Sequence, residues 1–428
     1  MSNSDSTILL FTDSYPYSLA KEDTFIEPEL HYLQSRFLSI ILIPKSFEGQ
    51  KTEIPKEIFV DLSLAESLKL KGIIRAFFYN LLFVMTSLIF YRELLKNPKI
   101  TLQPTAIVKN IFFLGTALRT KRWIQKQIRS KKYNLFRTIF YTYWLNEITM
   151  GICLAKKKYP KMIIISRAHG GDLYEERHNP NYIPYRPEIF KYISGVFPDS
   201  EKGKGYLKNR YSLNNSIIFT SRLGVTKQNF ITESSDDNIF RIVTCSYLVA
   251  VKRIDLLIEG LSVLAKIRPN NNFEWTHIGD GPLKKILEEI ASKLLPKNIK
   301  FTFTGSVPKG GVITYYKNHK IDVFINVSSS EGTPVSVMEA QSCGIPIIAT
   351  SVGGNTEIVN NENGYLLPAN PSPSEIAYVI CNVLENPSIL IDKKQKSIEN
   401  WNKWYNSEKN FNGFAQNLIE LLREHKIQ

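Results

Sequence analysis

The stretch NVSSSEGTPVSVMEAQSCGIPIIATSVGG, Asn326–Gly354, decides how the rest of this sequence is interpreted. The β-branched and aromatic run Ile321–Val327 leads into it and predicts a buried strand. Thr333 is a suitable N-cap and Pro334 suits the first position of a helix, so a helix is expected directly after a short polar loop. Ile345–Thr350 then predicts a second buried strand. The stretch is therefore expected to form a strand, a glycine-containing loop, a helix and a strand.

Two carboxylates stand out in this unit. Glu339 is the only acidic residue between Gly332 and Thr356, and it lies in a helix otherwise built of small and apolar residues. A buried carboxylate costs several kcal/mol unless it is paired or hydrogen-bonded. Glu331 precedes the helix by a few residues, and the free amides at the helix start predict an anion site between the two glutamates; these amides belong to Thr333, Val335 and Ser336. A capped helix with a solvated loop glutamate is the alternative.

The spacing of Glu331 and Glu339 resembles the E-x7-E signature of retaining GT-B glycosyltransferases, in particular the large family 4, the group 1 glycosyl transferases. The resemblance includes EGTPVSVMEAQSCGIPIIAT and the following VGGNTEIV. It implies that Glu331 lies near the donor sugar and that Glu339 holds the ribose. It also implies that the loop and helix start take the diphosphate, through Gly332, Thr333, Pro334 and Val335.

The length and element order predict two α/β domains. A chain of 428 residues is too long for one ordinary core. Strand and helix patterns alternate in the second half, which indicates a parallel, doubly wound sheet. With the resemblance, this gives a GT-B fold of two Rossmann-like domains facing a central cleft. The expected parts are an acceptor-binding domain at 1–225, a polar linker at 226–238, a nucleotide-sugar domain at 239–400, and a helix at 401–428 that crosses back to the first domain.

Positive charge is concentrated in the first half. Residues 1–230 carry 34 Lys and Arg against 19 Asp and Glu, whereas residues 231–428 carry 20 against 21. Such a basic surface favours an anionic partner. Residues 116–136 place apolar side chains at roughly helical spacing among Lys and Arg, which predicts an interfacial helix on anionic lipid; a solvated basic face packed on its own domain is the alternative. Nucleic acid is not expected, because no known nucleic-acid module is visible.

Residues 73–91 are the most apolar run of the chain. The uninterrupted part is shorter than the roughly 20 residues that a membrane-spanning helix needs. We therefore expect a buried or surface-docked helix rather than a transmembrane one.

Basic and glycine-rich loops in the second half are further candidates for the donor site. Family 4 members carry G-R-x-x-x-x-K after the first strand of this domain; here Ser246 and Tyr247 replace Gly-Arg, and Lys252 is retained. Lys252 is expected to neutralise the donor diphosphate. Arg253 is our hypothesis for the replacement of the missing arginine. The turn after the next strand, with Gly279 and Asp280, is implied to lie near the nucleotide, although an ordinary turn explains it equally well.

The first half contributes one candidate side chain. Arg167–Glu176, RAHGGDLYEE, follows a strand, so His169 and Asp172 are expected at the carboxyl edge of the sheet. The resemblance implies that His169 contacts the donor sugar or lies beside the acceptor. The loop after the first strand has Ser18, Leu19 and Ala20 where family members often have a Gly-Gly pair. Its substrate contacts are therefore left open.

The resulting hypothesis is a retaining, metal-independent hexosyltransferase that moves a sugar from a nucleoside diphosphate sugar to an acceptor hydroxyl in cell-surface polysaccharide assembly. No D-x-D motif or ligand cluster predicts a metal, and no cofactor is expected. A nucleotide-sugar epimerase and a noncatalytic GT-B binding subunit are the alternatives; nothing marks a pyridoxal-phosphate lysine. The expected partners are a glycan or lipid-linked acceptor and an anionic membrane surface. Four scattered cysteines and no visible signal peptide predict a cytoplasmic, membrane-peripheral location.

Overall fold

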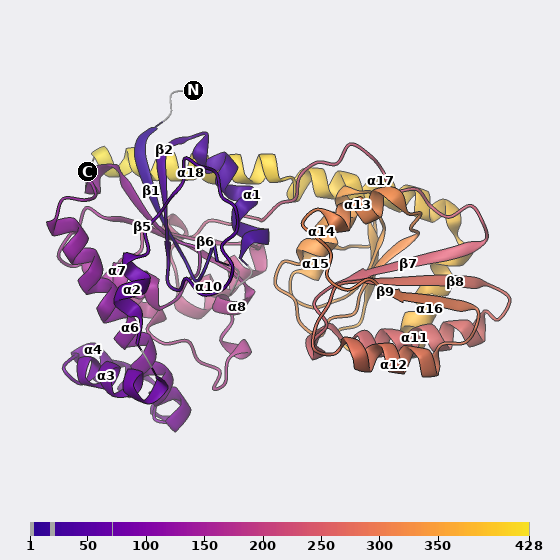
Figure 1. Cartoon of the computed structure of the whole chain (residues 1–428), viewed down its shortest axis with the longest axis horizontal. Helices are drawn as coiled ribbons and strands as arrows, with labels where there is room; N and C mark the ends of the chain where they lie inside the picture. Colours follow the sequence, from indigo (N-terminus) through magenta and orange to yellow (C-terminus); the bar gives the residue numbers. More distant parts are fainter. Residues whose placement is uncertain (1–3, 18–21, 71, 428) are drawn as a thin grey trace. The chain divides into compact units, whose positions relative to one another are not determined.

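The computed structural model describes residues 4–17, 22–70 and 72–427, and they form two compact units. The first unit comprises Met1–Arg222 together with Phe411–Gln428, and the second comprises Leu223–Asn410. Each unit is built around one six-stranded sheet with helices on both faces (Figure 1). This confirms the predicted two-domain α/β architecture.

The first sheet is parallel throughout and has the strand order β3-β2-β1-β4-β5-β6. Strands β4, β5 and β6 are buried on both faces, as the continuous apolar runs predicted. In register, Leu10 lies between Leu42 and Tyr141. The strands are β1 (Ser4–Thr12), β2 (Phe37–Pro44), β3 (Phe59–Val60), β4 (Thr138–Thr142), β5 (Ile163–Ala168) and β6 (Gly195–Pro198).

Ten helices of the described chain precede Arg222 in this unit, besides short 3-10 turns. One face of the sheet packs on α1 and on the last helix of the chain, where Phe414 and Leu418 are buried. The other packs chiefly on α6 and α7. The helices are α1 (Asp23–Gln34), α2 (Ser63–Leu68), α3 (Ile73–Met85), α4 (Leu88–Lys96), α5 (Pro98–Thr101), α6 (Pro104–Arg129), α7 (Glu147–Lys156), α8 (Gly170–Leu173), α9 (Arg186–Phe190) and α10 (Glu201–Tyr211).

Helix α6 corrects the prediction of an interfacial helix at 116–136. The helix ends at Arg129, and its apolar side chains Trp123 and Ile124 are buried in the core of the first unit. Close packing on α7 explains this, because a Cβ on Gly151 would lie 2.6 Å from the carbonyl oxygen of Ala117. Trp123 and Ile124 of α6 are therefore used by the fold, whereas Arg122, Lys126 and Arg129 remain at the surface.

The apolar run at 73–91 forms two helices. Helix α3 ends at Met85 and α4 begins at Leu88, and their axes differ by 94°. Among the described residues, no single helix is long and apolar enough to cross a membrane; these two pass the test of length and composition only when taken together. Both lie at the surface of the first unit, one of the two placements that the sequence favoured.

The second sheet is also parallel and has the order β12-β11-β10-β7-β8-β9. Its strands are β7 (Ile239–Cys245), β8 (Asn272–Ile278), β9 (Ile299–Phe303), β10 (Val323–Asn326), β11 (Ile347–Thr350) and β12 (Gly364–Leu367). Its helices are α11 (Ile254–Ile267), α12 (Lys284–Leu294), α13 (Gly311–Asn318), α14 (Val335–Ser342), α15 (Asn355–Ile358), α16 (Pro373–Glu385) and α17 (Pro387–Trp404). The strands predicted at Ile321–Val327 and Ile345–Thr350 are present as β10 and β11, with ends shifted by two residues at most, and the helix predicted between them is α14.

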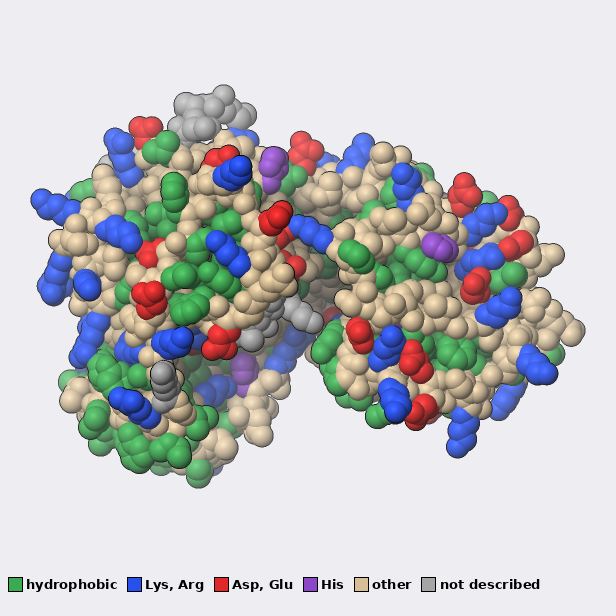
Figure 2. Space-filling model, in the orientation of Figure 1, with side chains coloured by type: hydrophobic (Ala, Val, Ile, Leu, Met, Phe, Trp, Pro, Cys, Tyr) green, Lys and Arg blue, Asp and Glu red, His purple; other side chains and the backbone are tan. Residues whose placement is uncertain are grey.

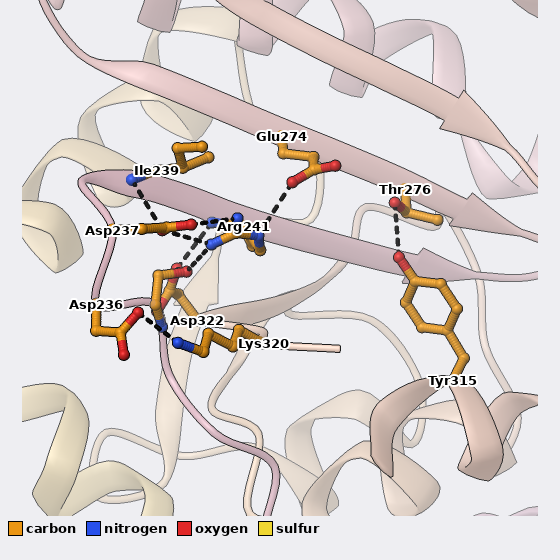
Figure 3. A network of polar contacts seen from close by, with 10 residues as sticks. Asp236, Asp237, Ile239, Arg241, Glu274, Thr276, Tyr315, Lys320 and Asp322 are labelled. Carbon is orange, nitrogen blue, oxygen red and sulfur yellow. Dashed lines mark hydrogen bonds and ion pairs between the residues drawn. The ribbon is translucent and has the colours of Figure 1, made fainter. Parts of the chain in front are cut away.

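Residues 226–238, expected as a linker, lie in the second unit and are tied to its sheet. The Arg241 guanidinium donates to Asp237 at 2.7 Å and to Glu274 at 3.0 Å, and Lys320 pairs with Asp236 (Figure 3). Asp322 is 4% exposed and accepts hydrogen bonds from the Arg241 amide and the Ser235 hydroxyl, each at 2.7 Å. The segment is thus held along its length by charge-assisted hydrogen bonds.

The C-terminal region contains two helices where one was expected. Helix α17 ends at Trp404 and α18 runs over Ser407–Ile427. Val225 occupies the break, donating its amide to the Tyr405 carbonyl at 2.9 Å and accepting from the Ser407 amide at 3.1 Å. The backbone bonds that would continue the helix are therefore used by another segment. From Phe411 onward, α18 belongs to the first unit.

We expect Asp322→Ala to destabilise the second unit by about 2 kcal/mol, because it leaves buried donors without an acceptor. Chemical denaturation followed by tryptophan fluorescence, with limited proteolysis at 226–238, measures this. Asp392→Ala, which removes an exposed aspartate from α17, is the control and should change stability by less than about 0.5 kcal/mol. Unchanged protease resistance in Asp322→Ala would contradict the assigned anchoring.

Candidate donor-binding edge of the second unit

The strand order of the second sheet reverses between β7 and β10. Connections from β7 lead to β8 on one side, whereas β10 continues to β11 on the other. In an open α/β sheet, ligands bind outside the carboxyl ends of the strands at such a reversal. The loop after β7 carries Lys252, and the loop after β10 carries Glu331. The Ser329 amide donates to the Val251 carbonyl at 2.8 Å and joins the two loops.

Glu331 is held by three donors from these loops. Its Oε1 atom accepts from Lys252 Nζ at 2.6 Å, from Ser328 Oγ at 2.6 Å and from Asn326 Nδ2 at 3.1 Å. The residue is 7% exposed, so its charge needs this compensation. The Lys252 side chain is more accessible, because 22% of it is exposed. The two residues that were predicted separately thus form one ion pair.

The Gly353–Gly354 pair lets a third loop close over Glu331. A Cβ on Gly353 would lie 1.9 Å from the Glu331 carbonyl oxygen, and one on Gly354 would lie 1.9 Å from that of Gly332. Gly353 also has φ of 46°, in the left-handed region. Only glycine fits at these two positions, which explains why the pair follows the predicted strand.

Helix α14 begins one residue later than predicted. Pro334 is its N-cap and Val335 its first residue, so Thr333 is not the cap. The Thr333 hydroxyl is buried and has no hydrogen-bond partner among the described residues. The first amides of a helix have no acceptor within the helix. Gly332, Thr333, Pro334 and Val335 therefore form the turn that presents the positive end of α14.

Glu339 lies on α14, half-buried. Burial raises the pKa of its carboxyl to about 7. In the part of the chain that the structure describes, this carboxyl accepts no hydrogen bond and has no ion pair, although a partner was expected from its setting. The pKa of the neighbouring Cys245 thiol is raised to about 12, by burial and by the charge of Glu339. The site leaves this carboxyl available to a ligand.

Arg253 has all parts of its guanidinium engaged by the protein. Its Nε donates to the Val327 carbonyl at 2.7 Å, and its Nη2 donates to the Ser328 and Ala369 carbonyls at 2.9 Å each. Nη1 donates to Asn370 Oδ1 at 3.1 Å. These contacts hold the loop before Glu331, and the hypothesis that Arg253 replaces the missing loop arginine stays a prediction.

The turn at Gly279 and Asp280 packs on the loop after β7. A Cβ on Gly279 would lie 2.1 Å from the Ser246 carbonyl oxygen, and Gly279 has φ of 140°. The Asp280 carbonyl accepts from the Leu248 amide at 2.9 Å, and its carboxylate caps the Gly281 amide at 2.7 Å. The structure therefore accounts for both residues as supports of the Ser246–Leu248 segment, while the Asp280 side chain stays exposed.

Sequence reasoning missed His277, at the end of β8. Its Nδ1 pairs with Thr244 Oγ1 at 2.9 Å and its Nε2 with the Ser246 carbonyl at 3.1 Å. Burial lowers its pKa to about 4, so the ring is neutral at physiological pH and its Nε2–H is the donor to the carbonyl. A histidine inside the strand pattern was the only available signal. Asn326 and Ser328 belong to the stretch Asn326–Gly354, but the sequence pattern did not predict that they donate to Glu331.

His169 lies at the carboxyl edge of the first sheet, as predicted, directly after β5. Its ring stacks on Tyr143, with centroids 4.8 Å apart, and its Nδ1 is 3.3 Å from Asp199 Oδ2. Its Nε2 is buried without a partner among the described residues. Asp172 accepts from the His169 amide at 2.6 Å and so shapes the turn. Asp199 was not predicted to matter; it orients the ring.

A second group of polar residues at the same edge was not predicted. Glu22 is 1% exposed and accepts from the amides of Asp13 and Ser14, at 3.0 and 2.7 Å. Burial raises the pKa of Asp13 to about 6, against the opposing effect of Lys45. The Ser18–Ala20 positions lie outside the described residues. Only tertiary contact brings these groups together, since Asp13, Glu22 and Lys45 belong to different segments.

Comparisons with known proteins agree with this architecture. The structure matches the lipopolysaccharide outer core galactosyltransferase WaaB over 95% of this chain and 98% of that one, with a TM-score of 0.67 and 16% identity. It matches Alr3699/HepE of Anabaena, solved with UDP and glucose, over 96% and 99%, with a TM-score of 0.63 and 16% identity. The chain therefore has the two-domain GT-B fold.

The sequence comparisons concern mainly the second unit. Residues 226–404 match the family model "Glycosyl transferases group 1". A curated relative, the GtfA subunit of the UDP-N-acetylglucosamine–peptide N-acetylglucosaminyltransferase of Streptococcus agalactiae, is 29% identical over 204 residues. The match covers 43% of this chain and 39% of that relative, so this chain spans well under two thirds of its length. The second unit is thus similar to group 1 glycosyl transferases.

Within the described residues, no group of three or more His, Cys, Asp or Glu side chains is arranged to hold a metal ion.

We predict that Glu339→Gln makes the chain's stability less dependent on pH. The folded chain holds the Glu339 proton up to about pH 7, whereas an unfolded glutamate releases it near pH 4.5. The free energy of unfolding therefore falls as the pH rises through this window, by about 2–3 kcal/mol at its upper end. Chemical denaturation at pH 4.5 and at pH 8 should show this loss of stability in the unmodified chain and not in Glu339→Gln.

Asp13 and His277 titrate in both proteins, so the difference between them isolates Glu339. Glu289→Gln, on the exposed face of α12, is the matched control. Parallel pH curves for Glu339→Gln and the unmodified chain would contradict the effect ascribed to burial.

Proposed function

We propose that this chain is a retaining, metal-independent glycosyltransferase that moves a sugar from a nucleoside diphosphate sugar to an acceptor hydroxyl. The observation that carries the proposal is the Lys252–Glu331 ion pair at the strand-order reversal, next to the first turn of α14. A cation and a helix N-terminus on one sheet edge favour a diphosphate. The similarity of residues 226–404 to group 1 glycosyl transferases supports the same class.

The proposed chemistry is displacement at the anomeric carbon. The acceptor hydroxyl forms a new C–O bond on the face from which the diphosphate departs, and the bond from the anomeric carbon to the phosphate oxygen breaks. The leaving diphosphate keeps that electron pair and takes the acceptor's proton. Lys252 and the first amides of α14 stabilise the negative charge that develops on it. The donor's anomeric configuration is therefore retained.

The two glutamates have different proposed roles because their surroundings differ. Glu331 is paired with Lys252 and held by Ser328, which suits an acceptor of hydrogen bonds from the donor sugar. Glu339 is half-buried and accepts no hydrogen bond from the described residues, so the ribose hydroxyls would supply its missing donors. We assign Gly332 to Val335 to the phosphates and Gly279 and Asp280 to the support of the nucleotide side. His169 is the proposed contributor from the first unit.

The acceptor and the cellular role are proposed more broadly. WaaB is described as a lipopolysaccharide outer core galactosyltransferase, and HepE was solved with UDP and glucose. On this ground we propose a hexosyl donor, a glycan or lipid-linked acceptor, and a role in cell-surface polysaccharide assembly from the cytoplasmic side. The first step is a thermal-shift screen against a panel of nucleotide sugars, because the donor then defines the assay.

We expect Lys252→Met to lower kcat for transfer by about a hundredfold or more, since one preorganised charge contact to the leaving group is lost. Glu331→Gln should lower transfer as well, because the amide cannot keep the same three donors. The rate is measured by release of nucleoside diphosphate with the donor found in the screen. Lys285→Met, on the exposed face of α12, is the control.

Three outcomes separate the alternatives. Unmodified activity in both Lys252→Met and Glu331→Gln would remove the assigned site. Sugar release or isomerisation without any dependence on an acceptor would favour an epimerase, and binding without turnover would favour a binding subunit. NMR of the product's anomeric proton tests retention, and full activity in excess EDTA is the expected result for a metal-independent enzyme.

We predict that Asp199→Asn reduces kcat/KM about tenfold with little change in thermal stability. The Asp199 carboxylate accepts from Nδ1–H of His169 and so leaves Nε2 as an acceptor for a substrate hydroxyl. The amide of Asp199→Asn can also donate to Nδ1 of His169, which favours the tautomer with a proton on Nε2. Nε2 then no longer accepts a hydrogen bond from the substrate hydroxyl. A merely structural Asp199 would lower the melting temperature and leave kcat/KM of the remaining folded protein unchanged.

A further inference from the structure

Helices α3 and α4 expose an apolar surface that the first unit does not use. The side chains of Ile73, Leu82 and Leu95 are 77%, 73% and 76% exposed. Figure 2 shows hydrophobic side chains gathered over the end of the first unit where Figure 1 places these two helices. We call this the α3–α4 surface, and define it by Ile73, Ile74, Phe78, Leu82, Leu88 and Leu95, all exposed.

This concentration differs from the rest of the surface. Of the 24 large apolar residues that are exposed among those described, nine lie between Ile73 and Leu95. The other exposed apolar residues are dispersed over the rest of the described chain. Isolated exposed apolar residues are ordinary, whereas contiguous ones indicate a surface that another partner covers.

The opposite face of α3 is fixed by its own unit. Val84 is fully buried, Asn80 is 3% exposed, and a Cβ on Gly115 of α6 would lie 2.6 Å from Asn80. Ile74, Phe78 and Leu82 follow one another at four-residue spacing and so form one stripe on the outward face. Helix α3 thus has apolar side chains on both faces: Val84, Phe77 and Leu81 pack inside the unit, and the outward stripe meets solvent.

A basic hollow borders this surface on α6. Its volume is about 580 Å³, and Arg122, Gln125, Lys126, Arg129 and Ser130 line it. The Arg122 guanidinium lies 4.0 Å from the centre of the Phe83 ring of α3, and Arg119 lies 5.4 Å from that of Tyr79. These contacts connect the basic residues of α6 directly to α3. No acidic residue occurs in the sequence between Glu93 and Glu147, and Glu93 itself is buried against Lys96 and Tyr182.

The geometry suits a surface that lies along a bilayer. Helix α3 has 13 residues, about 20 Å of helix, which is shorter than the hydrocarbon core of roughly 30 Å. Helix α4 departs from it at 94°, so the pair presents two short apolar faces and not one long rod. Apolar side chains beside a row of arginine and lysine match the boundary between acyl chains and anionic headgroups.

We propose that the α3–α4 surface inserts into the headgroup region of a bilayer that contains anionic phospholipid, and that the α6 hollow binds lipid phosphate groups. Membrane contact is thereby assigned to residues 73–95 with the surface of α6, in place of the apolar residues of 116–136. The inference rests on the first unit alone and does not require the proposed sugar transfer. If both hold, the first unit lies where a lipid-linked acceptor is presented.

The test is co-sedimentation of the full chain with vesicles. Vesicles of phosphatidylcholine alone are compared with vesicles of phosphatidylcholine and phosphatidylglycerol in equal parts. The unmodified chain should pellet with the anionic vesicles, and Ile74→Glu/Leu82→Glu should lower its partition coefficient at least tenfold, since two inserted side chains become charged. Ile391→Glu, which changes an equally exposed residue of α17, is the matched control and should pellet normally.

The basic hollow is tested separately with Lys126→Gln/Arg129→Gln. Each basic residue near an anionic surface contributes about a fivefold change in partition, so this variant should bind anionic vesicles on the order of twentyfold less tightly. High salt should reproduce much of that loss in the unmodified chain. Lys285→Gln/Lys293→Gln, two exposed lysines of α12, is the matched control.

Circular dichroism and thermal unfolding confirm that each variant is folded before its binding is compared. Equal pelleting of the Ile74→Glu/Leu82→Glu variant and the unmodified chain overturns the proposal. So does equal binding to neutral and anionic vesicles. A third contrary result combines two observations: the unmodified chain does not bind vesicles, and light scattering shows that it is a dimer. If Ile74→Glu/Leu82→Glu is then a monomer, the α3–α4 surface contacts a second copy of this chain and not a membrane.

Discussion

The burial of the Glu331 carboxylate is the constraint on which the ligand edge of the second unit depends. A carboxylate removed from water costs several kcal/mol unless opposite charge and hydrogen bonds replace its hydration. Lys252, Ser328 and Asn326 provide that replacement from the loops after the two strands that meet at the reversal of sheet order. Arg253 then holds the loop before Glu331, and two glycines let a third loop close over it. These contacts keep the first turn of α14 facing the same edge.

The two sheets have the same strand order when they are read from opposite edges, but different side chains lie at their carboxyl ends. At the edge of the second sheet, a cation and a helix N-terminus are arranged for an anion. At the edge of the first, His169 lies 3.3 Å from Asp199, and Lys45 lies near Asp13 and Glu147. The first unit also carries the apolar α3–α4 surface, on helices that add to the sheet-and-helix framework without changing it. The fold therefore places the three proposed binding features on different loops and helices.

The sequence predicted the framework well because local signals agree with the tertiary structure there. The strands predicted at Ile321–Val327 and Ile345–Thr350 are found as β10 and β11, and they differ from prediction only at their ends. Predictions failed where a distant segment intervenes. Val225 divides the predicted C-terminal helix, close packing on α7 buries the apolar side of α6, and α14 begins at Val335 because Pro334 takes the cap position. Periodicity reports that a face is apolar, but it does not report what covers that face.

By itself, the sequence determined the two parallel α/β units, the glycine and proline positions that end their elements, and the pair of glutamates eight residues apart. These follow from short-range rules of backbone geometry and from the burial of continuous apolar runs. Only the tertiary structure decided that Lys252 pairs with Glu331, that the Arg253 guanidinium is occupied by carbonyl groups, and that one apolar face of residues 73–95 is exposed. Each of these depends on which segments lie together once the sheets have formed, and a side chain's charge state and exposure depend on those neighbours.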